Sequence, residues 1–186
     1  MHPAPSVIFF SVFSGLGFGL LFWLGLGIPS PTGVVAFVFF AIAYLLAVGG
    51  LVASTFHLGQ PKRALKAFSQ WKTSWLSREA ICAVGALILM AIYGFGAVFL
   101  EQHWRAIGVL GGLLSLGTVF TTSMIYAQLK TVPRWHMPLT PLNFLSLSVA
   151  GGVLLAGQVT WAIWLITIAG GIQLATWVIG DTRFAA

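Results

Sequence analysis

Ionisable side chains are rare in this 186-residue sequence, and several of them lie at the ends of apolar stretches. His57 ends one such stretch, and Arg78 and Glu79 directly precede another. Histidine titrates near neutral pH, and a carboxyl group partly removed from water can do so too. Ionisable groups at membrane depth are costly and usually functional. The pair His57 and Glu79 is therefore a candidate site for proton exchange with a redox carrier such as a quinone headgroup.

A second group of polar and aromatic residues lies at a later junction between apolar stretches. It consists of Tyr126, Arg134, Trp135 and His136. With Arg78, this group could complete a pocket for the same headgroup. Each residue also has a structural interpretation, because aromatic and basic residues commonly anchor helix ends at a membrane interface. If Ser77 caps the helix that follows it, Glu79 falls in the first turn, where the helix dipole favours a carboxylate.

The composition indicates which elements must position these residues. Hydrophobic residues make up 59% of the chain and charged residues 6%, whereas soluble domains have roughly 25% charged residues. Six apolar stretches have about the 20 residues that a helix needs to cross a bilayer. They are 7–26, 33–56, 80–100, 106–129, 139–156 and 161–180. Since they are continuously apolar, we predict an all-α, polytopic transmembrane helix bundle that forms a single domain over residues 1–186.

Some details of this bundle have rival interpretations. The fifth stretch is short and carries Pro141 near its start, so a re-entrant segment is its main alternative. The first stretch lacks the basic residues and cleavage site of a signal peptide, and we expect it to be a retained helix. Cys82 is the single cysteine, which excludes an internal disulfide or a cysteine-ligated metal cluster within the chain. Glycines spaced four apart, at 15 and 19 and at 108 and 112, predict close helix packing.

The distribution of basic residues predicts the orientation of the bundle. Six helices place eight of the nine lysines and arginines on one side and only Arg105 on the other. Basic residues in short loops are retained in the cytoplasm, so the basic loops and both termini should be cytoplasmic. The loop 57–79 can also dock an acidic partner. Its candidate docking residues are Lys62, Arg63, Lys66 and Lys72.

Three blocks of this sequence resemble a known family, the anchor subunits of the DMSO reductase (DmsC) type within the complex iron–sulfur molybdoenzymes. The blocks are HLG-x-P-x-RA at 57–64, SWLSRE at 74–79, and MIY at 124–126 followed by PRW at 133–135. The resemblance spans roughly residues 5–180. It implies a subunit without haem or metal in a bacterial inner membrane, which binds a four-cluster iron–sulfur subunit and a molybdopterin catalytic subunit. It also implies electron exchange with menaquinone or ubiquinone, with residues matching His57 and Glu79 linked to quinol binding.

This sequence departs from the family in two respects. Members usually have about eight helices, so a six-helix protein is either a short member or a truncated version of a longer sequence. The best-known anchor serves an enzyme outside the cytoplasm, whereas the charge asymmetry here places the docking side inside. That arrangement resembles the sulfite dehydrogenase branch of the family.

The sequence leaves two functional classes open besides an anchor subunit. A haem b cytochrome needs histidines paired across helices, whereas His57 and His136 lie at helix ends on one side and His103 on the other. A small multi-pass transporter would have broken helices, polar groups near mid-membrane or an internal repeat. Gln173 is the main amide in the middle of an apolar stretch, and no nucleic-acid motif is present.

Overall fold

The computed structural model describes residues 5–55 and 68–185, and its regular structure there is helical. Its six helices are α1 (Pro5–Gly25), α2 (Gly33–Thr55), α3 (Trp75–Phe99), α4 (Arg105–Ala127), α5 (Leu139–Leu155) and α6 (Val159–Ala185). All except α5 are long and apolar enough to cross a membrane. The prediction of an all-α, multi-pass bundle is therefore confirmed, and the protein is a multi-pass membrane protein.

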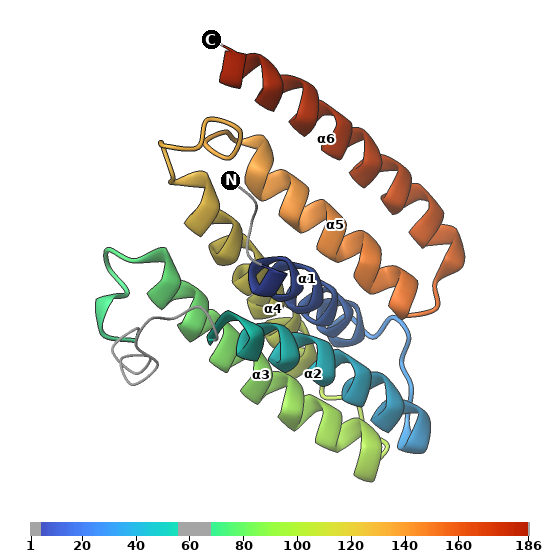
Figure 1. Cartoon of the computed structure of the whole chain (residues 1–186). Helices are drawn as coiled ribbons and strands as arrows, with labels where there is room; N and C mark the ends of the chain where they lie inside the picture. Colours follow the sequence, from blue (N-terminus) through green and yellow to red (C-terminus); the bar gives the residue numbers. More distant parts are fainter. Residues whose placement is uncertain (1–4, 56–67, 186) are drawn as a thin grey trace.

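Helix α1 lies inside the bundle and packs against α2, α4 and α5 (Figure 1). Helix α3 packs along α4 and more lightly against α2, while α6 lies at the edge of the bundle on α5. The central position of α1 explains its burial pattern. Ten of its 21 residues are buried, among them Phe18, Leu20, Leu21 and Leu24.

Glycines allow α1 to approach its neighbours closely, as the spacing of four predicts. A Cβ atom on Gly19 would overlap the carbonyl oxygen of Ser148 on α5, and one on Gly15 would lie 2.9 Å from the Ser148 Oγ atom. On α4, a Cβ atom on Gly108 would lie 2.8 Å from the carbonyl oxygen of Gly25. The predicted close packing at both glycine pairs is confirmed.

Helix α5 is a continuous helix of 17 residues that lies beside α6 along its length (Figure 1). Pro141 is in its first turn, where the missing N–H group breaks no helical hydrogen bond. A re-entrant segment would turn back at mid-depth. The continuous helix therefore favours a short crossing helix, about 26 Å long at 1.5 Å per residue.

One end of the bundle carries most of the described basic side chains. The turn at 68–74, the loop at 128–138 and the C-terminal end of α6 all lie there. Its described basic residues are Lys72, Arg78, Lys130, Arg134 and Arg183. Arg105 begins α4 at the opposite end. We call the first end the basic end.

Candidate functional site

The start of α3 differs from the sequence-based prediction in a way that bears on Glu79. The capping residue is Ser74, whose side chain accepts a hydrogen bond from the Ser77 backbone N–H at 3.4 Å, and the helix begins at Trp75. The prediction that Ser77 caps this helix was wrong. It assumed that the helix begins with the apolar residues from 80 onward, whereas the more polar residues 75–79 are also helical. Glu79 consequently lies beyond the first turn, which holds no acidic residue. The helix dipole therefore does not account for a carboxyl group at this position.

Glu79 is buried between α3 and α4, with only 4% of its surface exposed. Thr122 on α4 places its hydroxyl oxygen 2.5 Å from the Glu79 Oε1 atom. This distance is typical of a short hydrogen bond to a carboxylate. Thr122 belongs to a set of buried hydroxyl residues along α4, namely Ser115, Thr118, Thr121, Thr122 and Ser123. Two consecutive helices, α3 and α4, thus enclose one carboxyl group at the basic end through residues 43 positions apart.

The hydrogen bonds around Thr122 can accommodate two protonation states of Glu79. The Thr122 Oγ1 atom lies 2.5 Å from Glu79 Oε1 and 2.9 Å from the carbonyl oxygen of Thr118, but a hydroxyl group has one proton to donate. An ionised Glu79 accepts that proton. A neutral Glu79 donates its own proton to Thr122 Oγ1, and Thr122 then donates to the carbonyl of Thr118. The arrangement can therefore hold a proton or release it without leaving the carboxyl group unpartnered.

Tyr126 lies on α4 one helical turn after Thr122, the residue that bonds to Glu79. Its ring stacks on Phe144 of α5, with centroids 5.5 Å apart, and meets Trp135 edge-on at 5.4 Å. Tyr126 and Phe144 thus form an aromatic wall between α4 and α5. Of the predicted quinone-binding residues, Glu79 and Tyr126 are connected through Thr122, which bonds to Glu79 and lies one turn before Tyr126.

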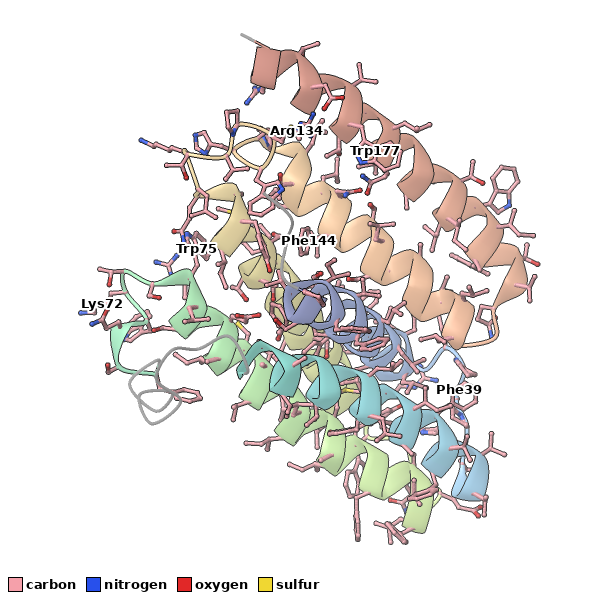
Figure 2. The ribbon with its side chains drawn as sticks, viewed as in Figure 1. Phe39, Lys72, Trp75, Arg134, Phe144 and Trp177 are labelled. Atoms are coloured by element: carbon pink, nitrogen blue, oxygen red, sulfur yellow. The ribbon has the colours of Figure 1, made fainter. Side chains whose placement is uncertain are left out.

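Arg78 is held against the turn that precedes α3. Its guanidinium group donates to the carbonyl oxygens of Trp71, at 3.0 Å, and Lys72, at 2.8 Å. It also lies 4.2 Å from the centre of the Trp75 ring, a cation–π distance. Arg78 therefore fixes the turn that carries Lys72, and Lys72 itself is exposed at the basic end (Figure 2).

Arg134 lies on the α5 and α6 side of the bundle. Its guanidinium group forms an ion pair of 2.7 Å with Asp181 of α6, and both side chains are more than half exposed. The loop is tied to α6 a second time, because Arg183 donates to the carbonyl oxygen of His136 at 3.0 Å. Figure 2 shows Arg134 and Trp177 near one another at this side.

Several predicted residues lie outside the described part of the sequence. They are His57, Lys62, Arg63 and Lys66. Their roles in quinone binding and docking stay predictions. Among residues 5–55 and 68–185, no three histidine, cysteine, aspartate or glutamate residues form a group that could hold a metal ion.

The structure adds residues that the sequence reasoning did not single out. Thr122 is the partner of Glu79, and Phe144 is the α5 side of the aromatic wall. The spacing of hydroxyl residues by three or four along α4 was the available signal for Thr122, since it places them on one helix face. No comparable pattern marks Phe144 in an apolar sequence.

The fold and the buried carboxyl group define a class, namely polytopic helical membrane proteins with a buried carboxyl group near one end of the bundle. The chain belongs to the DMSO reductase anchor subunit (DmsC) family, whose profile matches residues 1–178.

Two relatives illustrate this similarity. A subunit of the sulfite dehydrogenase of Allochromatium vinosum is 37% identical over 204 aligned positions, which cover 91% of this protein and 62% of the relative. A subunit of the anaerobic dimethyl sulfoxide reductase of Escherichia coli is 33% identical over 130 positions, covering 63% of this protein and 44% of the relative. The sequence thus spans less than two thirds of the length of either relative. No solved structure matches it significantly.

Proposed function

We propose that this protein is the membrane anchor and quinone-reactive subunit of an oxidoreductase complex. In this proposal it exchanges electrons between an iron–sulfur subunit and the quinone pool, while a molybdopterin subunit performs the substrate chemistry. Family membership supports the anchoring role, and the names of the two relatives support an oxidoreductase. The sulfite dehydrogenase branch is favoured over the DMSO reductase branch by the higher identity and the wider coverage of the sequence.

The observation that carries quinone reactivity is the buried Glu79 with its Thr122 partner. A quinone that takes up electrons also takes up protons, so its site needs a group that can deliver them through an otherwise apolar region. Glu79 is 4% exposed, and its hydrogen bonding accommodates both a protonated and an ionised carboxyl group. A structural ion pair is the alternative role for such a residue. The described partner of Glu79 is a hydroxyl group rather than a cation, which favours a role in proton transfer.

The location of Glu79 also suits this role. It lies at the basic end, directly after Arg78, which holds the turn bearing the exposed Lys72. We propose that this turn, with Lys62, Arg63 and Lys66, is the surface that docks the iron–sulfur subunit, since opposite charge fixes orientation and speeds association. Electrons would then have a short path from the partner to a headgroup near His57 and Glu79. The basic end would face the cytoplasm of a bacterial inner membrane.

The test separates quinone chemistry from assembly. In the purified complex, Glu79→Gln and His57→Ala should lower quinone-linked turnover at least about a hundredfold, as expected for loss of a general acid or base. Reduction or oxidation of an artificial dye by the catalytic subunit should be unchanged, because that electron path does not use the membrane site. Glu101→Gln is the matched control, since Glu101 is an exposed carboxylate beyond the far end of α3.

Three other results would contradict parts of this proposal. If Glu79→Gln depresses dye-linked and quinone-linked activity together, with loss of subunits from the membrane, Glu79 is a structural residue. If both variants keep normal quinone turnover, the quinone site lies elsewhere. Purification without any iron–sulfur protein would favour a transporter over an anchor subunit.

A further inference from the structure

A groove of about 540 Å³ runs between α1, α5 and α6. Its walls are largely apolar and include Leu16, Leu147 and Ile166, with glycines at 15, 151 and 170. Volumes of 300–1,000 Å³ are typical of small-molecule sites, so the groove can hold part of an elongated ligand. It borders the aromatic wall, because Phe144 lines the groove and stacks on Tyr126.

The groove continues toward the basic end as a second hollow of about 310 Å³ with a more polar lining. Asn143, Phe144 and Gln173 line both hollows. The second hollow is also lined by Arg134, Trp135, Thr140, Thr176, Trp177 and Asp181. Figure 2 shows Arg134, Phe144 and Trp177 at this side of the bundle. The whole cavity is thus amphiphilic, with a polar end near the membrane surface and an apolar end deeper in the bundle.

A pair of amides lies where the two hollows meet. Asn143 Nδ2 donates to Gln173 Oε1 at 2.8 Å. The Asn143 Oδ1 atom is buried and has no hydrogen-bond partner among the described residues. Asn143 is four residues after the start of α5, which places it about 6 Å along the helix at 1.5 Å per residue. A buried acceptor without a partner is costly, so a ligand that supplies a donor would be stabilised here.

The amide pair can also serve a ligand that supplies an acceptor. If both amides turn by half a rotation, Gln173 Nε2 donates to Asn143 Oδ1, and Asn143 Nδ2 becomes the free group. The free atom of Asn143 is then a donor instead of an acceptor. A quinol presents a hydroxyl donor and a quinone a carbonyl acceptor, so one amide pair can bind both redox forms. A phospholipid phosphate offers acceptors only, and an acyl tail offers neither.

We propose that this cavity is a quinone-holding site distinct from the contacts at Glu79, with the headgroup at Asn143 and Gln173 and the isoprenoid tail along the apolar groove. This inference rests on the proposed function, since quinone is its exchange partner. The site lies beside the aromatic wall formed by Tyr126 and Phe144, and Tyr126 is one helical turn from Thr122, the partner of Glu79. It supplies a waiting position for quinone that enters from the bilayer.

Two adjacent glycines provide a matched test of this site. Gly170 lines the groove, whereas Gly171 does not, and a Cβ atom added at either glycine meets nothing within 4 Å. Gly170→Leu should fill the groove without disturbing the fold, and Gly171→Leu should place the same side chain elsewhere. The probe is a decyl-substituted benzoquinone carrying a photoreactive azide, applied to the full-length protein in nanodiscs of defined phospholipid. Mass spectrometry then locates the labelled peptides.

We expect label on peptides from α5 and α6, at least tenfold weaker in Gly170→Leu and in Asn143→Leu, and unchanged in Gly171→Leu. Label confined to α3 and α4 and unaffected by Gly170→Leu would overturn the proposed cavity site while leaving quinone reactivity intact. Absence of label, with a phospholipid that co-purifies with the native protein and is lost in Gly170→Leu, would assign the groove to lipid. The separate turnover measurements on Glu79→Gln decide the proposed function itself.

Discussion

Thr122 supplies the polar partner of Glu79 inside the bundle, and its hydroxyl oxygen also lies within bonding distance of the Thr118 carbonyl. This geometry makes Thr122 a positioning residue, since it orients the carboxyl group without being a proton carrier of suitable acidity itself. The other buried hydroxyl groups of α4 bond to their own helix backbone. Thr118, for example, donates to the carbonyl oxygen of Leu114 at 3.0 Å.

Replacing Thr122 therefore tests the pairing. Thr122→Val keeps the shape of the side chain and removes the hydroxyl group, so the Glu79 carboxyl loses its partner. We expect quinone-linked turnover of the assembled complex to fall roughly tenfold, equivalent to about 1.4 kcal/mol in activation free energy. Thr122→Ser, which restores the hydroxyl group, should recover most of the activity.

The control for this experiment is Thr118→Val, which removes a hydroxyl group that is similarly buried in the same helix. It should leave turnover within about twofold of the native value. Equal losses in Thr118→Val and Thr122→Val would mean that the effect comes from packing of α4 rather than from Glu79.

Sequence reasoning could identify Glu79 because an acidic residue is conspicuous in so apolar a sequence. It could not identify Thr122, because the pairing depends on how α3 and α4 are rotated toward each other. The same applies to the contacts of Arg78 and Arg134, which the sequence places in a candidate headgroup pocket. The structure instead engages Arg78 with backbone carbonyls of its own turn and Arg134 with Asp181.

At the scale of helices, the contact between α1 and α5 depends on the absence of side chains at two glycines. Gly19 and Gly152 face each other so closely that a Cβ atom on either would overlap the backbone of the opposite helix. Close backbone approach of this kind is a main source of stability between helices in a bilayer, where the hydrophobic effect does not drive their association.

Gly19→Ala should therefore separate α1 from α5 and destabilise the folded protein by about 1–3 kcal/mol, the usual cost of overpacking. The change in stability is measured by heating the protein in detergent and recording how much of it stays in solution at each temperature. Gly49→Ala is the matched control, because Gly49 is an exposed glycine in α2 with nothing within 4 Å of an added Cβ atom. It should be neutral or slightly stabilising, and a loss equal to that of Gly19→Ala would contradict the close-packing account.

The number of helices followed from the lengths of the apolar stretches, but their ends did not. Helix α3 begins at Trp75 rather than at residue 80, because polar residues of its first turns face the neighbouring helix and the loop. Hydropathy measures the free energy of transferring a side chain into lipid, and it contains no information on such local hydrogen bonds. For the same reason, hydropathy could not identify Ser74 as the N-terminal capping residue of α3.

At the scale of the whole molecule, the charge asymmetry predicts the orientation of the bundle in the membrane, and this prediction can be tested. The described loops that contain Lys72 and Lys130 lie at one end of the bundle, and Gln102 lies at the other. Reporter domains that are active on only one side of the membrane, inserted after Lys130 and after Gln102, should give opposite signals, with Lys130 cytoplasmic. Equal signals at both positions would contradict the six-helix topology, and reversed signals would contradict the cytoplasmic orientation.

Helix α6 is attached to this bundle more weakly than the others. Of its described side chains and glycines, Ala162, Ala169 and Gly180 are buried, compared with ten buried residues in α1. Elements with few buried contacts open at the lowest free energy. A molecule could therefore move between the bilayer and the α5–α6 groove by displacing one outer helix while α1 to α4 stay packed. Its residence time would then depend on the stiffness of a single helix pair, largely independent of the stability of the protein.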